Sequence, residues 1–156
     1  MNYPMTRVGF ERLEDELKEL KNVKRPGVIA AIAVAREHGD LSENAEYHAA
    51  REEQSHIEGR VMEIENIISQ ANIIDISSIK MDTIAFGASV KIVNEDTNEE
   101  STYQIVGEVE ADFNDGRISN TSPLGRALIG KEVGESIDFQ APGGVKYYEV
   151  LSISYN

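Results

Sequence analysis

Apolar residues recur at intervals of three and four from Thr6 to about Ala71, and a short polar stretch near residue 40 interrupts them. This spacing is typical of the seam of a coiled coil, in which one stripe of each helix faces a partner helix. Two seams joined by a short break predict an antiparallel helical hairpin. The predicted seam is Leu13, Leu17, Leu20, Lys24, Gly27, Ala31 and Val34 on the first arm and Ala50, Gln54, Ile57, Val61, Ile64, Ile68 and Ala71 on the second.

Three features refine this hairpin. Thr6 is the predicted N-cap of the first helix. Pro26 lies inside the first arm and is expected to bend it locally, because proline has no amide donor. Small residues crowd the seam near the bend, which predicts closely spaced helices that bury little apolar area. Each arm of about thirty residues would reach roughly 45 Å, so we expect a long, thin probe. The small residues are Ala30, Ala31, Ala33, Ala35, Ala45, Ala49 and Ala50.

From about Ile73 the pattern changes to short stretches that alternate or are rich in β-branched and aromatic residues. They predict strands over 88–94, 101–107, 135–141 and 146–155, with a polar loop at 94–100 and a tight turn at 142–144. A short helix is predicted at 122–130, with Ser122 as N-cap, Pro123 at its first position and Gly130 after its end. The predicted fold class is α+β, with a helical hairpin over residues 1–76 and a small antiparallel sheet domain with one helix over 77–156.

Composition narrows the class of protein. The chain has 156 residues and no cysteine, which excludes a disulfide framework and a thiolate zinc site. Its first twenty residues hold no apolar stretch like a signal peptide, and no run is long enough to span a bilayer. We therefore expect a soluble protein of a reducing cytoplasm. The formal charge of -13 repels nucleic acid at long range, so another protein would have to bring this chain to it. The charge is equally typical of a protein that only needs solubility.

The bend is unusually rich in acidic and polar side chains. On pattern alone, the favoured interpretation is that Asp40 caps the second helix and that Glu43 completes a capping box. The alternative is that Asp40 and Glu43, about one helical turn apart, present oxygens to one Mg²⁺. Because magnesium takes about six oxygen ligands, two carboxylates are too few. If the bend binds metal usefully, another molecule must supply the remaining ligands.

Other candidate groups lie near the bend. His48 and His56 are roughly 12 Å apart along a helix, so one ion cannot bridge them, and these two and His38 are expected to be solvated or hydrogen-bonded. Arg36 and Arg51 flank the bend, one on each arm. Their sequence context favours two interpretations about equally, namely pairing with acidic neighbours on their own helix or contact with a phosphate backbone. No phosphate-binding glycine loop or activated serine or cysteine motif is present.

The stretch IAAIAVAREHGDLSENAEYHAAREEQ (29–54) closely resembles the first-domain motif of bacterial transcript cleavage factors of the Gre family. PMT (4–6), ADFNDGRIS (111–119) and SPLGRALIGKEVGE (122–135) resemble further parts of the same family, so that the likeness covers nearly the whole chain. The acidic balance and the few basic residues of the hairpin favour the less basic branch of that family.

The resemblance implies a function. In this family the hairpin enters the secondary channel of RNA polymerase, and tip carboxylates that match Asp40 and Glu43 help to hold the second catalytic Mg²⁺. The polymerase then cleaves backtracked nascent RNA near its 3′ end and resumes elongation. The resemblance implies RNA contact near the tip, for which Arg36 and Arg51 are the candidates. It also implies an FKBP-like second domain that docks on the channel rim, which we place near Ser122 and Pro123.

On this interpretation the protein is not an enzyme and has no cofactor of its own beyond the Mg²⁺ of the polymerase. Its expected partners are RNA polymerase and the nascent RNA 3′ end, without a membrane, and the free protein is expected to be a monomer. A channel binder that does not promote cleavage is the main alternative, but the presence of both Asp40 and Glu43 argues against it. A prolyl isomerase would need an aromatic-lined pocket, and the chain has no tryptophan. A coiled-coil holdase would need an apolar tip.

Overall fold

The computed structural model describes residues 2–39, 44–76 and 82–155. It forms two compact units, one of them Phe10–Ala71 and the other Met1–Gly9 together with Asn72–Asn156. We call Phe10–Ala71 the helical unit and Met1–Gly9 with Asn72–Asn156 the strand-rich unit. The domain boundary predicted between residues 76 and 77 differs from this division, because the start of the chain belongs with the strand-rich unit. There β1 (Tyr3–Thr6) pairs with β2 (Ala71–Ile74), two strands that the sequence pattern did not predict.

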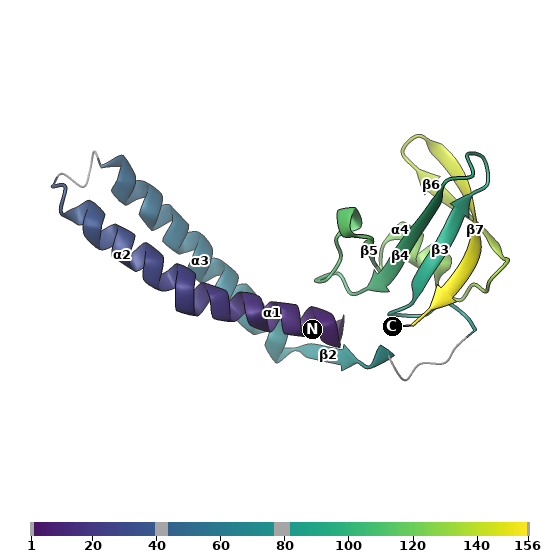
Figure 1. Cartoon of the computed structure of the whole chain (residues 1–156), viewed down its shortest axis with the longest axis horizontal. Helices are drawn as coiled ribbons and strands as arrows, with labels where there is room; N and C mark the ends of the chain where they lie inside the picture. Colours follow the sequence, from purple (N-terminus) through teal and green to yellow (C-terminus); the bar gives the residue numbers. More distant parts are fainter. Residues whose placement is uncertain (1, 40–43, 77–81, 156) are drawn as a thin grey trace. The chain divides into compact units, whose positions relative to one another are not determined.

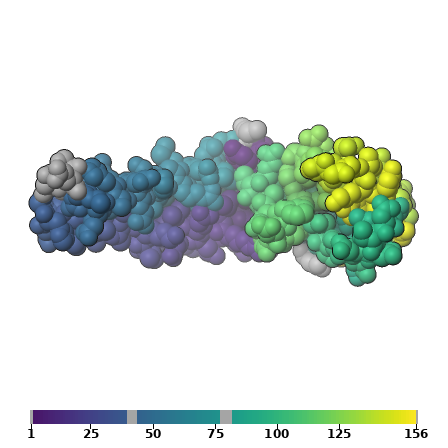
Figure 2. Space-filling model, turned by 90° about the horizontal axis from the view of Figure 1, so that it is seen from above, coloured from purple at the N-terminus to yellow at the C-terminus, as the bar shows by residue number. Residues whose placement is uncertain are grey.

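The helical unit is the predicted antiparallel hairpin (Figure 1). Its first arm consists of α1 (Arg7–Glu19), a π-helical turn (Leu20–Lys24) and α2 (Arg25–Arg36), and its second arm is α3 (Ala45–Ser69). The atoms of α2 and α3 lie against one another along the pair (Figure 2). Thr6 is confirmed as the N-cap of α1, since its hydroxyl oxygen accepts a hydrogen bond from the Gly9 amide at 3.1 Å.

The π-helical turn displaces the seam of the first arm by one residue. The Arg25 amide donates to the Leu20 carbonyl, five residues back instead of four. Pro26 follows directly and has no amide hydrogen to donate, so the helix passes the proline by widening this turn rather than by continuing its regular ladder. From there to the bend, each side chain therefore lies about one position out of the register that a continuous α-helix would give.

The predicted seam is consequently wrong between the π-helical turn and the bend. Lys24, Gly27, Ala31 and Val34 are exposed, and the buried residues are Val28, Ile32 and Ala35. Of the seven small residues near the bend, only Ala35 and Ala50 are buried. The predicted alanine seam is thus replaced by one in which larger aliphatic side chains also take part.

The second arm follows the predicted seam over most of its length. Ala50, Ile57, Val61 and Ile64 are buried as predicted, and Gln54 is half-buried. The prediction fails at the end of the arm. There Ile67 is buried and Ile68 only partly, and Ala71 has already left the helix for β2.

Ion pairs join the two arms on either side of this seam. Arg25 binds Glu58 through two hydrogen bonds of 2.8 and 2.6 Å, and Arg60 binds Glu16 through two of 2.7 and 2.8 Å. Hydrogen bonding to these arginines lowers the pKa of both glutamates. Both pairs lie at the surface, where solvent screens the charges, so neither is a main source of stability. Their main effect is to fix the register of one arm against the other.

The strand-rich unit contains a five-stranded sheet in the order β5-β4-β3-β7-β6 (Figure 1). The predicted strands are confirmed, and they join antiparallel neighbours. The fifth strand, which the sequence did not predict, pairs in parallel with β4, so the sheet is mixed rather than antiparallel throughout. Three residues are too few to show an alternating pattern. The strands are β3 (Ser89–Asn94), β4 (Glu100–Val106), β5 (Arg117–Ser119), β6 (Ser136–Ala141) and β7 (Gly144–Ser154).

One short helix, α4 (Pro123–Leu128), packs on this sheet and completes its core. Leu124 and Leu128 of the helix join a cluster of buried aliphatic side chains from the strands, among them Ile92, Ile105 and Val150. The predicted ends of the helix are confirmed. Ser122 is its N-cap, and Gly130 just beyond it has a φ of +89°, a conformation that favours glycine.

Candidate functional site

The bend of the hairpin lies between the end of α2 at Arg36 and the start of α3 at Ala45. Asp40 and Glu43, the two predicted metal-binding carboxylates, lie outside the described residues. The described residues of this site are therefore those that flank the two carboxylates. They are Glu37 to Gly39 before the carboxylates and the residues from Asn44 onward after them.

Asn44 joins the two helices at the base of the bend. Its backbone is extended, and its side-chain oxygen accepts a hydrogen bond from the Tyr47 amide at 3.1 Å, so it is the N-cap of α3. Its side-chain nitrogen donates to the Ala35 carbonyl of α2 at 2.7 Å. The predicted cap at Asp40 is thus wrong, because α3 begins only after Asn44. Asparagine caps helices as well as aspartate does, so the sequence already contained this signal.

The chain leaves α2 through a short series of turns. The amides of Glu37, His38 and Gly39 donate to the carbonyls of residues 34, 35 and 36, at 3.1 to 3.3 Å. Gly39 has a φ of +99°, which L side chains rarely adopt. The backbone conformation therefore explains why glycine stands before Asp40 in the motif, since a residue in the left-handed conformation ends the helix at this point.

Charged and aromatic side chains surround this base. His38 Nε2 lies 3.9 Å from Glu46 Oε2, across the bend, and both side chains are largely exposed. The Arg51 guanidinium lies over the Tyr47 ring, 6.0 Å from its centre, and the His48 ring meets the same tyrosine edge-on. Among the described residues no ion pair joins Arg51 to Glu46, so one of the pairings that the sequence allowed for this arginine is absent. Arg36 and Arg51 are both exposed near the bend.

The described residues do not form a metal centre by themselves. Among residues 2–39, 44–76 and 82–155, no three histidine or carboxylate side chains are grouped closely enough to hold an ion. This finding does not extend to Asp40 and Glu43. In the same residues, no helix combines the length and the apolar character needed to cross a membrane.

Ser122 and Pro123, the predicted contact with the polymerase rim, lie in the strand-rich unit. The Ser122 hydroxyl accepts from the Gly125 amide at 3.0 Å and donates to the Ser119 carbonyl at 2.7 Å. Pro123 is exposed at the first position of α4. The half-buried serine therefore shapes this corner of the unit, and the exposed proline lies beside it.

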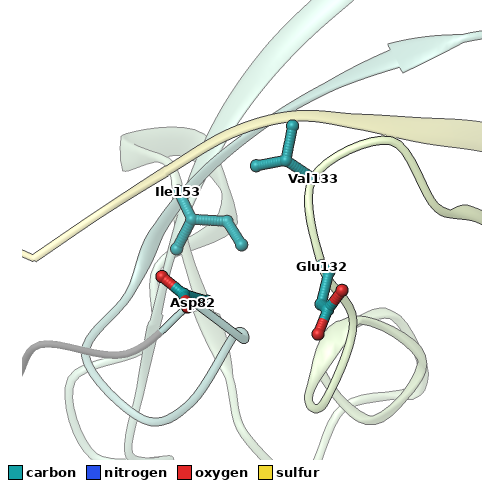
Figure 3. A pocket seen from close by; sticks show the side chains of 4 residues that line it. All are labelled: Asp82, Glu132, Val133 and Ile153. Atoms are coloured by element: carbon teal, nitrogen blue, oxygen red, sulfur yellow. The ribbon is translucent and has the colours of Figure 1, made fainter.

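An open pocket in the same unit was not predicted from the sequence. Its described lining consists of Asp82, Glu132, Val133 and Ile153 (Figure 3). The residues before β3 and after α4 come together here through a β-bridge between Thr83 and Glu132. None of the four lining residues is aromatic, so this pocket does not resemble the aromatic-lined site that a prolyl isomerase would need.

Comparisons with known proteins agree over almost the whole chain. The family described as "Transcription elongation factor, N-terminal" (GreA_GreB_N) matches residues 3–73, and "Transcription elongation factor, GreA/GreB, C-term" matches residues 79–155. The chain is 60% identical over 152 residues to the transcription elongation factor GreA of Rhodospirillum rubrum and 59% identical over 152 residues to that of Caulobacter sp. strain K31. Each alignment covers 97% of both proteins. The solved structure of GreA factor homolog 1 (Gfh1) from Thermus thermophilus aligns over 99% of both chains with 26% identity and a TM-score of 0.46.

Proposed function

The chain belongs to the GreA/GreB family of transcription elongation factors, and on that premise we propose that it lends the carboxylates of its bend to the active site of RNA polymerase. In this proposal the hairpin enters the secondary channel of the polymerase. There Asp40 and Glu43 promote the cleavage of backtracked nascent RNA, which rescues arrested elongation complexes. The observation that carries the proposal is the sequence of the bend, with two carboxylates placed where the helical pair ends and little core remains to be stabilised.

The chemistry of the two side chains fits this role. Aspartate and glutamate provide the hard oxygen ligands that Mg²⁺ prefers, but two carboxylates cannot complete an octahedral set. The polymerase and the RNA therefore have to supply the other ligands. When it is bound in such a shared site, Mg²⁺ polarises a water molecule for attack on a phosphodiester bond.

The described residues near the bend have complementary roles in this proposal. Arg36 and Arg51 are exposed on opposite arms and provide the cationic groups that contact phosphates. With a net charge of -13, the chain as a whole repels free nucleic acid. The factor therefore meets RNA only where the polymerase presents the 3′ end to its tip.

The chain is a transcription factor rather than an enzyme, and in our proposal the hydrolysis belongs to the polymerase. The free factor is proposed to be a cytoplasmic monomer without a cofactor of its own. The alternative is a factor that occupies the channel without promoting cleavage. The next experiment distinguishes this alternative from our proposal.

The decisive experiment uses stalled, backtracked elongation complexes with Mg²⁺ and follows the shortening of labelled RNA from its 3′ end. We expect the wild-type factor to speed cleavage and Asp40→Asn with Glu43→Gln to abolish the effect while polymerase binding is retained. The matched control is Glu52→Gln with Glu53→Gln, which removes the same two charges from exposed positions of α3 and is expected to behave as wild type.

Three results would contradict the proposal. Cleavage at the wild-type rate by the double variant would show that the two carboxylates are not used. Cleavage of RNA by the factor without polymerase would make it an enzyme. Saturation of the isolated chain with Mg²⁺ at micromolar concentration would show a complete site where we propose a shared one.

The rim contact is proposed separately and has its own test. Pro123→Glu places a carboxylate at the first position of α4, where the helix dipole tolerates it. We expect this variant to bind polymerase more weakly and to reach the normal cleavage rate when it is present in excess. Gln140→Glu adds the same charge at an exposed position of β6 and should bind normally. Equal affinities of the two variants would place the contact elsewhere.

A further inference from the structure

The exposed side of α2 is apolar along its length. The helix packs against α3 through Val28, Ile32 and Ala35, and its remaining side chains face outward. A surface helix ordinarily carries charged or polar residues on its outward side. Here no charged or polar side chain lies between Arg25 and Arg36. The exposed residues of this interval, which we call the α2 face, are Pro26, Gly27, Ile29, Ala30, Ala31, Ala33 and Val34.

The first half of the same arm shows the ordinary arrangement. In α1 every exposed residue except Val8 is charged. The exposed side of the arm therefore changes from charged to apolar where α2 begins. The apolar surface is confined to the part of the arm that leads to the bend.

Helix propensity explains only part of the α2 face. Its three alanines could serve the helix alone, because alanine is the best helix former. Ile29 and Val34 are poorer helix formers than glutamate or lysine, and Gly27 is among the least favourable residues in a helix. Ile29 is 51% exposed and Val34 is 54% exposed, so much of each side chain remains outside the seam. A contiguous apolar surface of this kind is typical of a site that a partner covers.

Charge decides which class of partner fits the α2 face. Nucleic acid does not fit, because the face offers no cation to phosphates between Arg25 and Arg36. A membrane surface fits helices with a free basic side, whereas the other side of α2 is packed on α3. A second copy of the chain carries the same net charge of -13, so the two copies repel one another. The complement that remains is an apolar, uncharged surface of another protein.

We infer that the α2 face is the side of the hairpin that lies against RNA polymerase, on an apolar part of the channel wall. The inference rests on the proposed function, because entry of the hairpin into the channel brings α2 against the polymerase. A Cβ atom at Gly27 would meet no atom within 4 Å, so the space beside this part of the helix is open to a partner. Burial of the face provides a hydrophobic contribution to affinity that the charged outer side of α1 cannot give.

The test places single charges on the α2 face. Ile29→Glu and Ile29→Lys add opposite charges, and Ala30→Glu adds a charge at a second exposed position of the face. The matched controls are Met62→Glu and Met62→Lys, which replace a 72% exposed apolar side chain of α3. Circular dichroism checks that each variant keeps the helical content of wild type, as expected for exposed positions.

Affinity is measured by titrating labelled factor with polymerase, and cleavage is followed separately at saturating factor in backtracked complexes. We expect both Ile29 variants and Ala30→Glu to bind roughly 10-fold or more weakly, because either charge would lose its water against an apolar wall. The two Met62 variants should bind as wild type does. At saturating concentration Ile29→Glu should reach the normal cleavage rate, since the substitution weakens docking alone.

Four results would overturn the inference. Wild-type affinity of Ile29→Glu and Ala30→Glu would show that the polymerase does not touch the α2 face. Opposite effects of Ile29→Glu and Ile29→Lys would show a charged partner surface. Equal losses in the Met62 variants would show a general effect of added charge or bulk on the hairpin. Self-association of the wild-type chain in sedimentation, abolished by Ile29→Glu, would assign the face to a second copy.

The proposed function is tested by a different readout. Asp40→Asn with Glu43→Gln is expected to change cleavage and to leave affinity intact, whereas the variants of the α2 face are expected to change affinity and to leave the maximal cleavage rate intact. Either hypothesis can therefore fail while the other stands.

Discussion

Thr6 and Glu110 are 104 residues apart in the chain, and the Glu110 carboxylate accepts hydrogen bonds from both the amide and the hydroxyl of Thr6, at 2.5 and 3.0 Å. The same hydroxyl caps the first turn of α1 by accepting the Gly9 amide. A carboxylate at this place also interacts favourably with the positive end of the helix. The first turn of the hairpin helix is therefore held by a residue from the far part of the sequence.

Gly9 allows this contact. A Cβ atom at Gly9 would overlap the Glu110 carboxyl group, whereas one at Gly59 in α3 would meet no atom within 4 Å. We therefore expect Gly9→Ala to lower the free energy of unfolding by about 1–3 kcal/mol, because Glu110 has to leave Thr6. Gly59→Ala should raise it by about 0.5–1 kcal/mol through helix propensity alone. Urea unfolding followed by circular dichroism measures both, and stabilisation by both substitutions would contradict the contact.

The shifted seam of the first arm gives a second prediction. Val28 is 3% exposed and Val34 is 54% exposed, although the heptad pattern had placed Val34 in the seam. Val28→Ala should lower the free energy of unfolding by about 2 kcal/mol, since it leaves a cavity between the arms. Val34→Ala should change it by less than about 0.5 kcal/mol. The same denaturation assay decides between the two registers, and a larger loss for Val34→Ala would support a regular α-helix through Pro26.

The Glu16–Arg60 pair predicts how stability depends on pH. Hydrogen bonding to Arg60 lowers the pKa of Glu16 in the folded chain below its ordinary value of 4.5. The carboxylate therefore contributes stability above that ordinary pKa and loses it as the pH falls through the lower folded value. Glu16→Gln should cost about 0.5–1 kcal/mol at neutral pH, less in high salt and nothing once the carboxylate is protonated.

The control for this pair is Glu11→Gln, at an exposed position of the same helix that makes no ion pair among the described residues. Unfolding midpoints measured from neutral to strongly acidic pH should converge for wild type and Glu16→Gln and should stay equal for wild type and Glu11→Gln. A cost of Glu16→Gln that does not change with pH would mean that the pair acts through packing rather than charge.

The two arginines near the bend give a prediction on RNA contact. Arg36→Gln and Arg51→Gln should each slow factor-dependent cleavage at low salt by roughly 3- to 10-fold, which corresponds to about 1 kcal/mol for one lost phosphate contact. Arg12→Gln, on an exposed part of α1, should have no such effect. The cleavage assay at two salt concentrations distinguishes the cases. Equal effects of all three substitutions would indicate a general influence of charge on polymerase binding.

Much of the fold followed from local patterns. Apolar spacing was enough to predict both arms of the hairpin, and alternation was enough for four strands of the sheet. The ends of α4 were also local, because the serine, proline and glycine that define them act on their own turn of backbone. The family followed from the motif around the bend, and the comparisons confirmed it.

Three features could not be predicted from the sequence, because they depend on distant or competing contacts. A heptad count assumes a uniform helix, so it could not include the extra residue of the π-helical turn before Pro26. The strand β5 is defined by its partner β4 rather than by its own three residues. The choice of Asn44 over Asp40 as the cap of α3 depends on where that helix begins, and several residues in the bend have capping side chains.

The sequence by itself determined the two kinds of structure, the family and the chemistry of the bend, because these depend on side-chain types and on spacing along one segment. Only the tertiary structure decided which face of α2 is buried, which residue closes the bend, and that Glu110 holds the start of α1. Each of these depends on atoms that are brought together across the chain. Their hydrogen bonds and packing compete with local preferences of similar size, so a local pattern alone cannot rank them.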